Sequence, residues 1–304
     1  MFSFGLMADL QYCDAPDGFS HVEKHPRRYR QSLETLRLAA LSFEANQTTC
    51  NVLLGDQIDF KCDSLGATQQ CLQRVLDVTR STAAEWHLCV GNHDLSALSR
   101  EAVLAAYIPP SAAPFNAACP PSASRLYWAH CPCTGCRFLF LDPFDISALN
   151  ASCPEHTAQA EATLLRNPNL QGDRKHGDWF TGLSPSEQRY VPYNGAVSHR
   201  QLAWIRAQLV AAAAADEIVF VFCHTPLYHG AASPAGLLWN AEEVLALLQS
   251  HSCCKAVFSG HDHQGGYARD SAGLHHVVPA APLECDAGQP SFGTLHVKVR
   301  LGLG

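Results

Sequence analysis

Seven side chains that could bind metal ions stand in five short motifs, each at or just after the end of an apolar run. In chain order they are Asp9 and Gln11, Asp56, Asn92, His224, and His261 with His263. Carboxylate, amide and imidazole ligands together suit borderline divalent ions, whereas an all-oxygen set favours Mg²⁺ or Ca²⁺. The pattern therefore predicts an enzyme with divalent metal ions. Mn²⁺ is the expected metal, and Fe²⁺, Zn²⁺ and Mg²⁺ are alternatives.

Asp56 has the central place in this series, and one carboxylate can bridge two ions. A bridged pair about 3.5–4 Å apart is used in phosphoester hydrolysis, where it activates water and neutralises the charge of the attacked phosphate. We therefore expect two ions and hydrolysis at phosphorus.

The elements that must position these ligands alternate between strands and helices, as in α/β proteins. Apolar runs of strand length alternate with helical stretches, which the hydrophobic periodicity predicts at 28–44, 67–81, 198–215 and 241–250. Each of these helices precedes a motif strand. Because ligands in α/β proteins gather where strands end, the five motifs can converge in one crevice.

The motifs read Asp-x-Gln, Gly-Asp-x-x-Asp, Gly-Asn-His-Asp, a lone His after a strand, and Gly-His-x-His. This series resembles the calcineurin-like metallophosphoesterase superfamily. The resemblance implies a four-layer α/β sandwich of two mixed β-sheets flanked by helices. It implies one ion held by Asp9, Gln11, Asp56 and His263, and a second held by Asp56, Asn92, His224 and His261.

The resemblance also implies three catalytic residues that do not bind metal. His93 matches the family position that protonates the leaving oxygen or stabilises its charge. Asp59 and Asp94 match positions where a carboxylate orients a ligand or an imidazole.

Gln11 stands where many members of the superfamily have His, and this replacement resembles a narrower branch, the manganese-dependent ADP-ribose/CDP-alcohol diphosphatases. Further segments agree with that branch: 2–5, 17–19, 27–33, 141–147, 182–184, 193–195, 201–204, 238–240 and 265–267. The branch implies hydrolysis of the pyrophosphate bond of ADP-ribose, or of a CDP-alcohol such as CDP-choline, to a nucleoside monophosphate and a phosphorylated sugar or alcohol. The alternatives are a phosphomonoesterase or cyclic-nucleotide phosphodiesterase on the same fold, and a binding scaffold without activity.

We expect one catalytic domain over residues 1–304, with substrate-binding loops around 12–30, 109–135 and 150–197. Long loops over a crevice are commonly binding loops or lids. The candidate substrate contacts are Phe19, Tyr193 and Trp239, which could stack on a base, and Arg27 and Arg28, which could bind phosphate.

The composition limits the partners. A net charge of −7 gives no basic field of the kind that nucleic-acid binders use. We expect neither a leader peptide nor a membrane-spanning segment, because the first apolar strand leads directly into a motif and no apolar stretch has membrane-spanning length. The expectation is a cytoplasmic monomer whose partner is a small nucleoside diphosphate, with contact neither to nucleic acid nor to membrane.

The 14 cysteines are too few among 304 residues for a disulfide scaffold, and we interpret them as mostly free thiols. Cys131, Cys133 and Cys136 could form a zinc site with Cys119 or His130. The alternative, which we favour because paired Cys-x-x-Cys halves are missing, is a glycine-containing turn between two strands.

Overall fold

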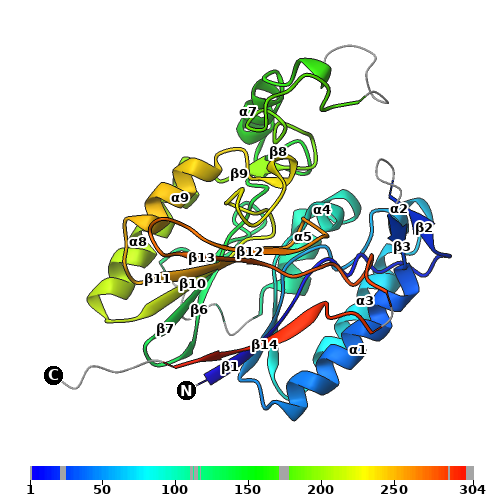
Figure 1. The fold of residues 1–304 in the computed structure, drawn as a ribbon, viewed down its shortest axis with the longest axis horizontal. Helices are drawn as coiled ribbons and strands as arrows, with labels where there is room; N and C mark the ends of the chain where they lie inside the picture. Colours follow the sequence, from blue (N-terminus) through cyan, green and yellow to red (C-terminus); the bar gives the residue numbers. More distant parts are fainter. Residues whose placement is uncertain are drawn as a thin grey trace.

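Two mixed β-sheets lie face to face in the computed structural model, which describes residues 2–20, 25–109, 112, 116, 118–170, 178–286 and 288–298 (Figure 1). The first sheet has the strand order β14 (Phe292–Val297), β1 (Phe2–Met7), β4 (Cys50–Leu53) and β5 (Glu85–Leu88). The second has the order β12 (Gly266–Arg269), β13 (His275–Val278), β11 (Cys254–Phe258), β10 (Ile218–Phe222), β7 (Cys136–Phe140) and β6 (Trp128–Cys133). β14, β12 and β6 pair antiparallel with their neighbours, and the other pairs are parallel.

Helices cover the outer face of each sheet. The long ones are α1 (Tyr29–Ala45) and α3 (Thr68–Arg80) on the first sheet, and α8 (His199–Ala214) and α9 (Ala241–Gln249) on the second. Each agrees with its predicted range to within one residue at either end. The predicted four-layer sandwich is therefore confirmed. In the described parts of the chain, every helix is too short or too polar to cross a bilayer.

The alternation of side chains along each strand decides which layer they join. In β10, Phe220 and Phe222 face the other sheet, whereas Val219 and Val221 pack against the helices. The core between the sheets is rich in aromatic rings, and it includes Phe4, whose ring centroid lies 5.2 Å from that of Phe138 and 5.6 Å from that of Phe258. These contacts hold the two sheets together.

Parallel register brings the ends of the motif strands to a common edge. Met7 is paired with Leu53, and Leu53 with Leu88, so β1, β4 and β5 end side by side. Phe222 is likewise paired with Phe258 at the ends of β10 and β11. The chain leaves each of these ends directly into a motif.

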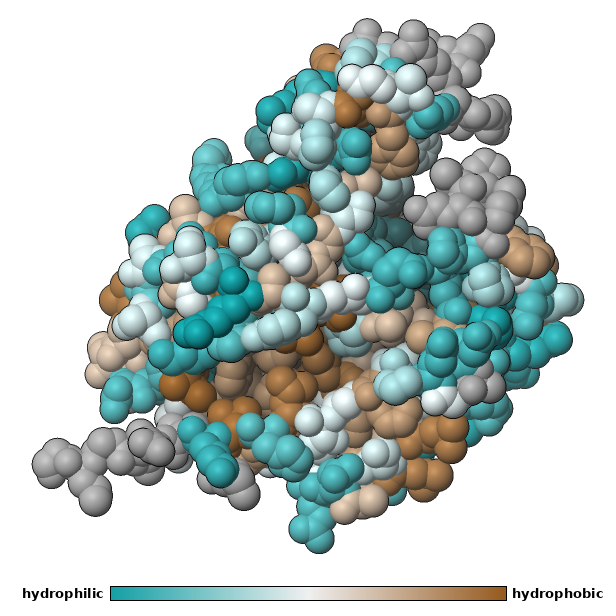
Figure 2. Space-filling view, in the orientation of Figure 1, coloured by the Kyte–Doolittle hydropathy of each residue, from teal (hydrophilic) through white to brown (hydrophobic). Residues whose placement is uncertain are grey.

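The shorter elements flank that edge. They are β2 (Gly18–Phe19), β3 (Pro26–Arg27), α2 (Lys61–Ser64), α4 (Asn92–Ala97), α5 (Arg100–Tyr107), β8 (Ile146–Ser147), α7 (Pro154–Leu164), η1 (Pro168–Leu170), β9 (Gly195–Ala196) and η2 (Pro234–Gly236). Figure 2 shows the surface hollowed between the part that carries α7, β8 and β9 and the part that carries α2, β2 and β3, with hydrophilic residues around the hollow.

The predicted loops are only partly loops. The range 109–135 ends in β6, and the range 150–197 contains α7, which we did not predict because it buries a single side chain, Ala160, and so has no apolar stripe. Residues 21–24, 110–111, 113–115, 117 and 171–177 of these ranges lie outside the described residues.

The cysteine-rich segment contains the end of β6, the turn at residues 134–135 and the start of β7. Cys133 pairs with Cys136, and Gly135 between them has a φ of 81°, which confirms the predicted turn. All 14 cysteines are free thiols. Among the described residues, Cys131, Cys133 and Cys136 are in none of the groups of three possible ligands whose atoms lie within 4.8 Å of one another. The zinc alternative therefore has no geometric support.

Candidate metal centre

The motif residues meet beyond the aligned strand ends. Ligand atoms of Asp9, Asp56 and His224 all lie within 4.8 Å of one another, and all three side chains are buried. Nε2 of His224 is 3.6 Å from Oδ2 of Asp56 and 3.1 Å from Oδ1 of Asn92. The ring of His261 lies 5.1 Å from the ring of His224, and its backbone N–H donates to the Asp9 carboxylate. Residues from all five motifs thus share one site.

Gln11 and His263 complete this cluster on the side of Asp9. Nε2 of Gln11 donates to Oδ2 of Asp56 at 3.1 Å and lies 2.9 Å from Nε2 of His263. That same His263 nitrogen is 3.8 Å from Oδ1 of Asp9. The structure therefore places all seven predicted ligands in one connected group, with Asp56 in contact with members of both predicted sets.

The backbone of the cluster is strained. Asp9, Gln11, Asp56 and His261 have φ angles of 51°, 39°, 55° and 70°. Left-handed conformations of residues other than glycine are uncommon and cost about 1–3 kcal/mol each when the surroundings impose them. Four of the seven such residues in the described chain are predicted ligands. This concentration of strain indicates a functional site.

Two glycines allow the strands to approach so closely. A Cβ atom on Gly91 would lie 2.0 Å from Oδ1 of Asp56, and one on Gly55 would lie 2.4 Å from Nδ1 of His224. Gly55 also has a φ of 104°, which a side chain would strain. Any other residue at either position would displace a predicted ligand.

The charges of the cluster fit divalent cations. Burial raises the pKa of Asp9 well above its ordinary value, and the adjacent Asp56 carboxylate raises it further. Burial lowers the pKa of His261 well below its ordinary value, and the neighbouring His224 adds to this effect. Crowded carboxylates beside neutral imidazoles offer lone pairs to a cation, and the binding of a cation relieves the repulsion between the carboxylates.

Each predicted histidine ligand has one ring nitrogen held by a second group. Nδ1 of His224 lies 2.7 Å from the carbonyl oxygen of Leu54, and Nδ1 of His263 lies 2.7 Å from Oε1 of Glu284. Nε2 of His261 lies 2.7 Å from Oδ1 of Asn194. Such contacts fix the orientation and tautomer of a ligand. Sequence reasoning missed Glu284 altogether and used Asn194 only as part of a family segment.

Asp94 joins the loops that follow β4 and β5. Its carboxylate accepts hydrogen bonds from the backbone N–H groups of Gly91, Asp56 and Gln57 at 3.0 Å each, and from the Tyr107 hydroxyl at 2.9 Å. Burial raises the pKa of Asp94 to about 7, and Asp56 adds to the shift. These contacts support a positioning role for Asp94.

His93 lies beside the cluster with one nitrogen toward Asp59 and the other toward the centre. Its Nδ1 is 3.1 Å from Oδ2 of Asp59, and its Nε2 is 3.9 Å from Oδ2 of Asp56. Burial acts to lower the pKa of His93, but the Asp56 charge and the Asp59 hydrogen bond outweigh burial and raise it. Burial acts to raise the pKa of Asp59, but the hydrogen bond and charge of His93 outweigh burial and lower it. This pair favours a protonated imidazole.

The predicted substrate contacts have different surroundings. Phe19 is 70% exposed on β2, and the ring of Tyr193 lies 5.6 Å from that of His261. Nη1 of Arg27 donates to Oε1 of Gln11 at 2.7 Å and lies 3.5 Å from Oδ2 of Asp59. Phe19 is thus open to solvent, while Tyr193 and Arg27 lie beside the metal centre.

The other two predicted contacts, Arg28 and Trp239, interact mainly with other parts of the protein. Arg28 donates to the carbonyl oxygens of Glu284 and Cys285 and pairs with Asp286, so it holds the segment that carries Glu284. Trp239 is only 4% exposed and packs with Tyr190 and other residues. This burial leaves little of the ring exposed, and the role of Trp239 in base stacking stays a prediction.

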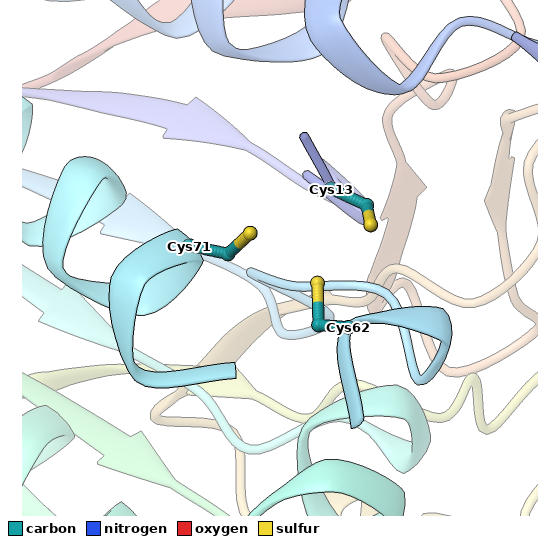
Figure 3. A group of neighbouring side chains, drawn as sticks. All are labelled: Cys13, Cys62 and Cys71. Carbon is teal, nitrogen blue, oxygen red and sulfur yellow. The ribbon is translucent and has the colours of Figure 1, made fainter. Parts of the chain in front are cut away.

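Three thiols pack behind the Gln11 loop, and Figure 3 shows Cys13, Cys62 and Cys71 together. Their sulfur atoms lie within 4.8 Å of one another, and each side chain is 0% exposed. Burial raises the pKa of both Cys13 and Cys62, so these thiols stay neutral. The Cys62 thiol donates to the carbonyl oxygen of Tyr12 at 3.3 Å. Neutral thiols in such a place pack as small apolar groups and tie the loop to α2 and α3.

Comparison with known proteins agrees with this centre. The family described as calcineurin-like phosphoesterase matches residues 2–265, and the chain belongs to that family of metal-dependent phosphoesterases. Within it, the chain is 35% identical to the manganese-dependent ADP-ribose/CDP-alcohol diphosphatase of Oryza sativa and 34% identical to that of Arabidopsis thaliana. The alignments cover 98% of this chain and 88% and 91% of those proteins. The chain is thus a member of the diphosphatase branch, as the sequence resemblance indicated.

Solved structures give the same result. A dimetal phosphatase from Danio rerio superposes with a TM-score of 0.86 and 30% identity over 96% of this chain and 91% of that one. A purple acid phosphatase from yellow lupin reaches a TM-score of 0.51 at 12% identity, over 91% of this chain and 43% of that one, and shares the fold alone.

Proposed function

We propose that this protein hydrolyses the pyrophosphate bond of ADP-ribose and of CDP-alcohols with two divalent ions, Mn²⁺ by preference. The observation that carries the proposal is the single cluster of all seven predicted ligands around the buried Asp56. The names of the relatives supply the substrate class and the metal. We assign one ion to Asp9, Gln11, Asp56 and His263, and the other to Asp56, Asn92, His224 and His261.

The chain's own residues then have distinct tasks. Two bound ions would supply an activated water and charge neutralisation at the attacked phosphorus. His93 directs Nε2 toward the centre and gives a proton to the leaving oxygen, while Asp59 holds Nδ1. Asp94 holds the backbone N–H groups of Asp56 and of Gly91, which precedes Asn92, so that both ligands keep their geometry.

Arg27 is the residue best placed to bind a substrate phosphate. Its guanidinium lies beside both Gln11 and Asp59, and its buried Nε has no hydrogen-bond partner among the described residues. A guanidinium offers five N–H donors in a planar fork that matches phosphate oxygens. Arg27 can therefore keep its contact with Gln11 and still donate to a phosphate. Phe19 and Tyr193 remain our candidates for contact with the base.

Arg27→Ala is expected to lower kcat/KM for ADP-ribose by about 10- to 100-fold, since a hydrogen bond from a charged group contributes roughly 1.5–3 kcal/mol. Steady-state kinetics at saturating Mn²⁺ measures this loss. Arg37→Ala is the matched control, because Arg37 is an exposed residue of α1 that pairs with Glu34. An Arg27→Ala enzyme with the control's kcat/KM would remove Arg27 from the substrate site.

The activity is tested by comparing kcat/KM for four compounds with Mn²⁺. We expect ADP-ribose and CDP-choline to exceed p-nitrophenyl phosphate and 3′,5′-cyclic AMP by at least about 10²-fold, because the nucleotide and its partner supply binding energy away from the reacting phosphorus. Preference for p-nitrophenyl phosphate would favour a phosphomonoesterase, and preference for cyclic AMP a cyclic-nucleotide phosphodiesterase. Inactivity on all four would favour a binding scaffold.

A further inference from the structure

A second group of metal-ligand side chains lies where the edge strands β5 and β6 meet. It consists of Glu85 and His87 from β5 and His130 from β6, and one ligand atom from each lies within 4.8 Å of the other two. Oε2 of Glu85 is 4.0 Å from Nε2 of His87, and the two histidine rings are 4.4 Å apart between centroids. None of the three belongs to the centre around Asp56.

Strand register explains why these side chains face one another. Glu85 and His87 are two positions apart and lie on the same face of β5, next to Cys50 and Val52 of β4, which belong to the core between the sheets. On β6, His130 is paired with Phe138, another residue of that core. At this edge of the sandwich, Glu85 and His87 therefore project from the first sheet and His130 from the second.

His87 has an unusual environment for a histidine. Its side chain is 0% exposed, and neither ring nitrogen has a hydrogen-bond partner among the described residues. Burial lowers the pKa of His87 well below its ordinary value, and the nearby His130 lowers it further, so the ring is neutral. A buried polar group without a partner is costly and rare, and an ion that is not yet accounted for is one of its recognised explanations.

We propose that Glu85, His87 and His130 bind one further divalent transition-metal ion of zinc's class. Two imidazoles and one carboxylate are a common ligand set for zinc and similar ions. Tetrahedral ligand atoms about 2.0–2.2 Å from zinc lie roughly 3.3–3.6 Å from one another. The distances between the ligand atoms of the three side chains therefore need to shorten by at most about 1.5 Å. Glu85 is exposed and His130 half-buried, which gives the ion a path from solvent.

The ion would cross-link the two sheets. It would join the edge strand of the first sheet to the edge strand of the second and give His87 its missing partner. β5 also runs directly into the loop that carries Asn92. By fixing the position of β5, the ion would therefore also restrict the motion of the loop that presents Asn92 to the catalytic centre.

Zinc content per chain tests this proposal. The full-length protein is dialysed against Zn²⁺, freed of loosely bound ions and measured by elemental mass spectrometry. We expect three zinc ions for the unaltered protein, of which two are at the catalytic centre, and two for both His130→Ala and Glu85→Gln. His296→Ala is the matched control on the exposed face of β14, at the opposite edge of the first sheet, and should keep three.

Two zinc ions in the unaltered protein, or a third ion that survives His130→Ala and Glu85→Gln, would overturn the proposal. If these variants fail to fold, crystals of the unaltered protein grown with Zn²⁺ decide it. An anomalous-scattering peak between His87 and His130 at the zinc absorption edge is expected, and the absence of density there would contradict the proposal. Neither measurement depends on which substrate the enzyme hydrolyses.

Discussion

Asp56→Asn is expected to lower turnover by at least about 10³-fold and to loosen both ions. Asp56 contacts Gln11 on one side and His224 on the other, so it is the side chain that both proposed sites share. A neutral amide bridges two cations poorly, because it lacks the second charged oxygen. The loss should therefore exceed that from any ligand that serves a single ion. Steady-state kinetics and metal content measured on the same samples give both quantities.

Asp63→Asn is the matched control, since Asp63 is an exposed carboxylate on α2 whose replacement alters the net charge in the same way. It should retain full activity and both ions. Two tightly held ions and near-normal turnover in Asp56→Asn would show that Asp56 does not bridge, and the assignment of the two ligand sets would have to change.

His93→Ala is expected to retain both ions while turnover falls by about 10²–10⁴-fold, the usual range for a positioned proton donor. The pKa of His93 is raised by Asp56 and Asp59, and Nε2 faces the centre. The residue can thus hold a proton where a leaving oxygen would need it. The fall should also depend on the leaving group, since a stable anion departs without protonation.

A series of aryl esters of a nucleoside monophosphate tests this dependence. The loss in His93→Ala should be large for an unactivated phenyl ester and small for a p-nitrophenyl ester. His199→Ala, an exposed position at the start of α8, should change neither rate. Equal losses for both esters, or departure of an ion, would mean that His93 positions the centre and that another group assists the leaving oxygen.

The ligands and long helices were predictable because their signals are local. A ligand set at strand ends needs only a polar motif after an apolar run, and α1, α3, α8 and α9 each bury a regular stripe of side chains. Helix α7 gives no such signal. The antiparallel addition of β14 to β1 depends on a pairing almost 300 residues apart, which no local pattern encodes.

The residues that surround the ligands were the least predictable. Glu284 orients His263, and Tyr107 hydrogen-bonds Asp94, yet neither stands in a motif. Their roles arise from tertiary packing, which brings distant segments to the centre. The same limitation applies to Trp239, because the sequence did not indicate that its ring packs against Tyr190.

The most direct test of the central claim is product analysis of ADP-ribose hydrolysed with Mn²⁺ in ¹⁸O-labelled water. A dimetal hydrolase that breaks the pyrophosphate bond must yield AMP and ribose 5-phosphate, with one labelled oxygen in the phosphate of one of these products. The anomeric oxygen of the sugar exchanges with water by itself and is left out of the count. Mass spectrometry identifies both products and locates the label. Release of inorganic phosphate or free adenine, or the absence of label from both product phosphates, would contradict pyrophosphate cleavage at this centre.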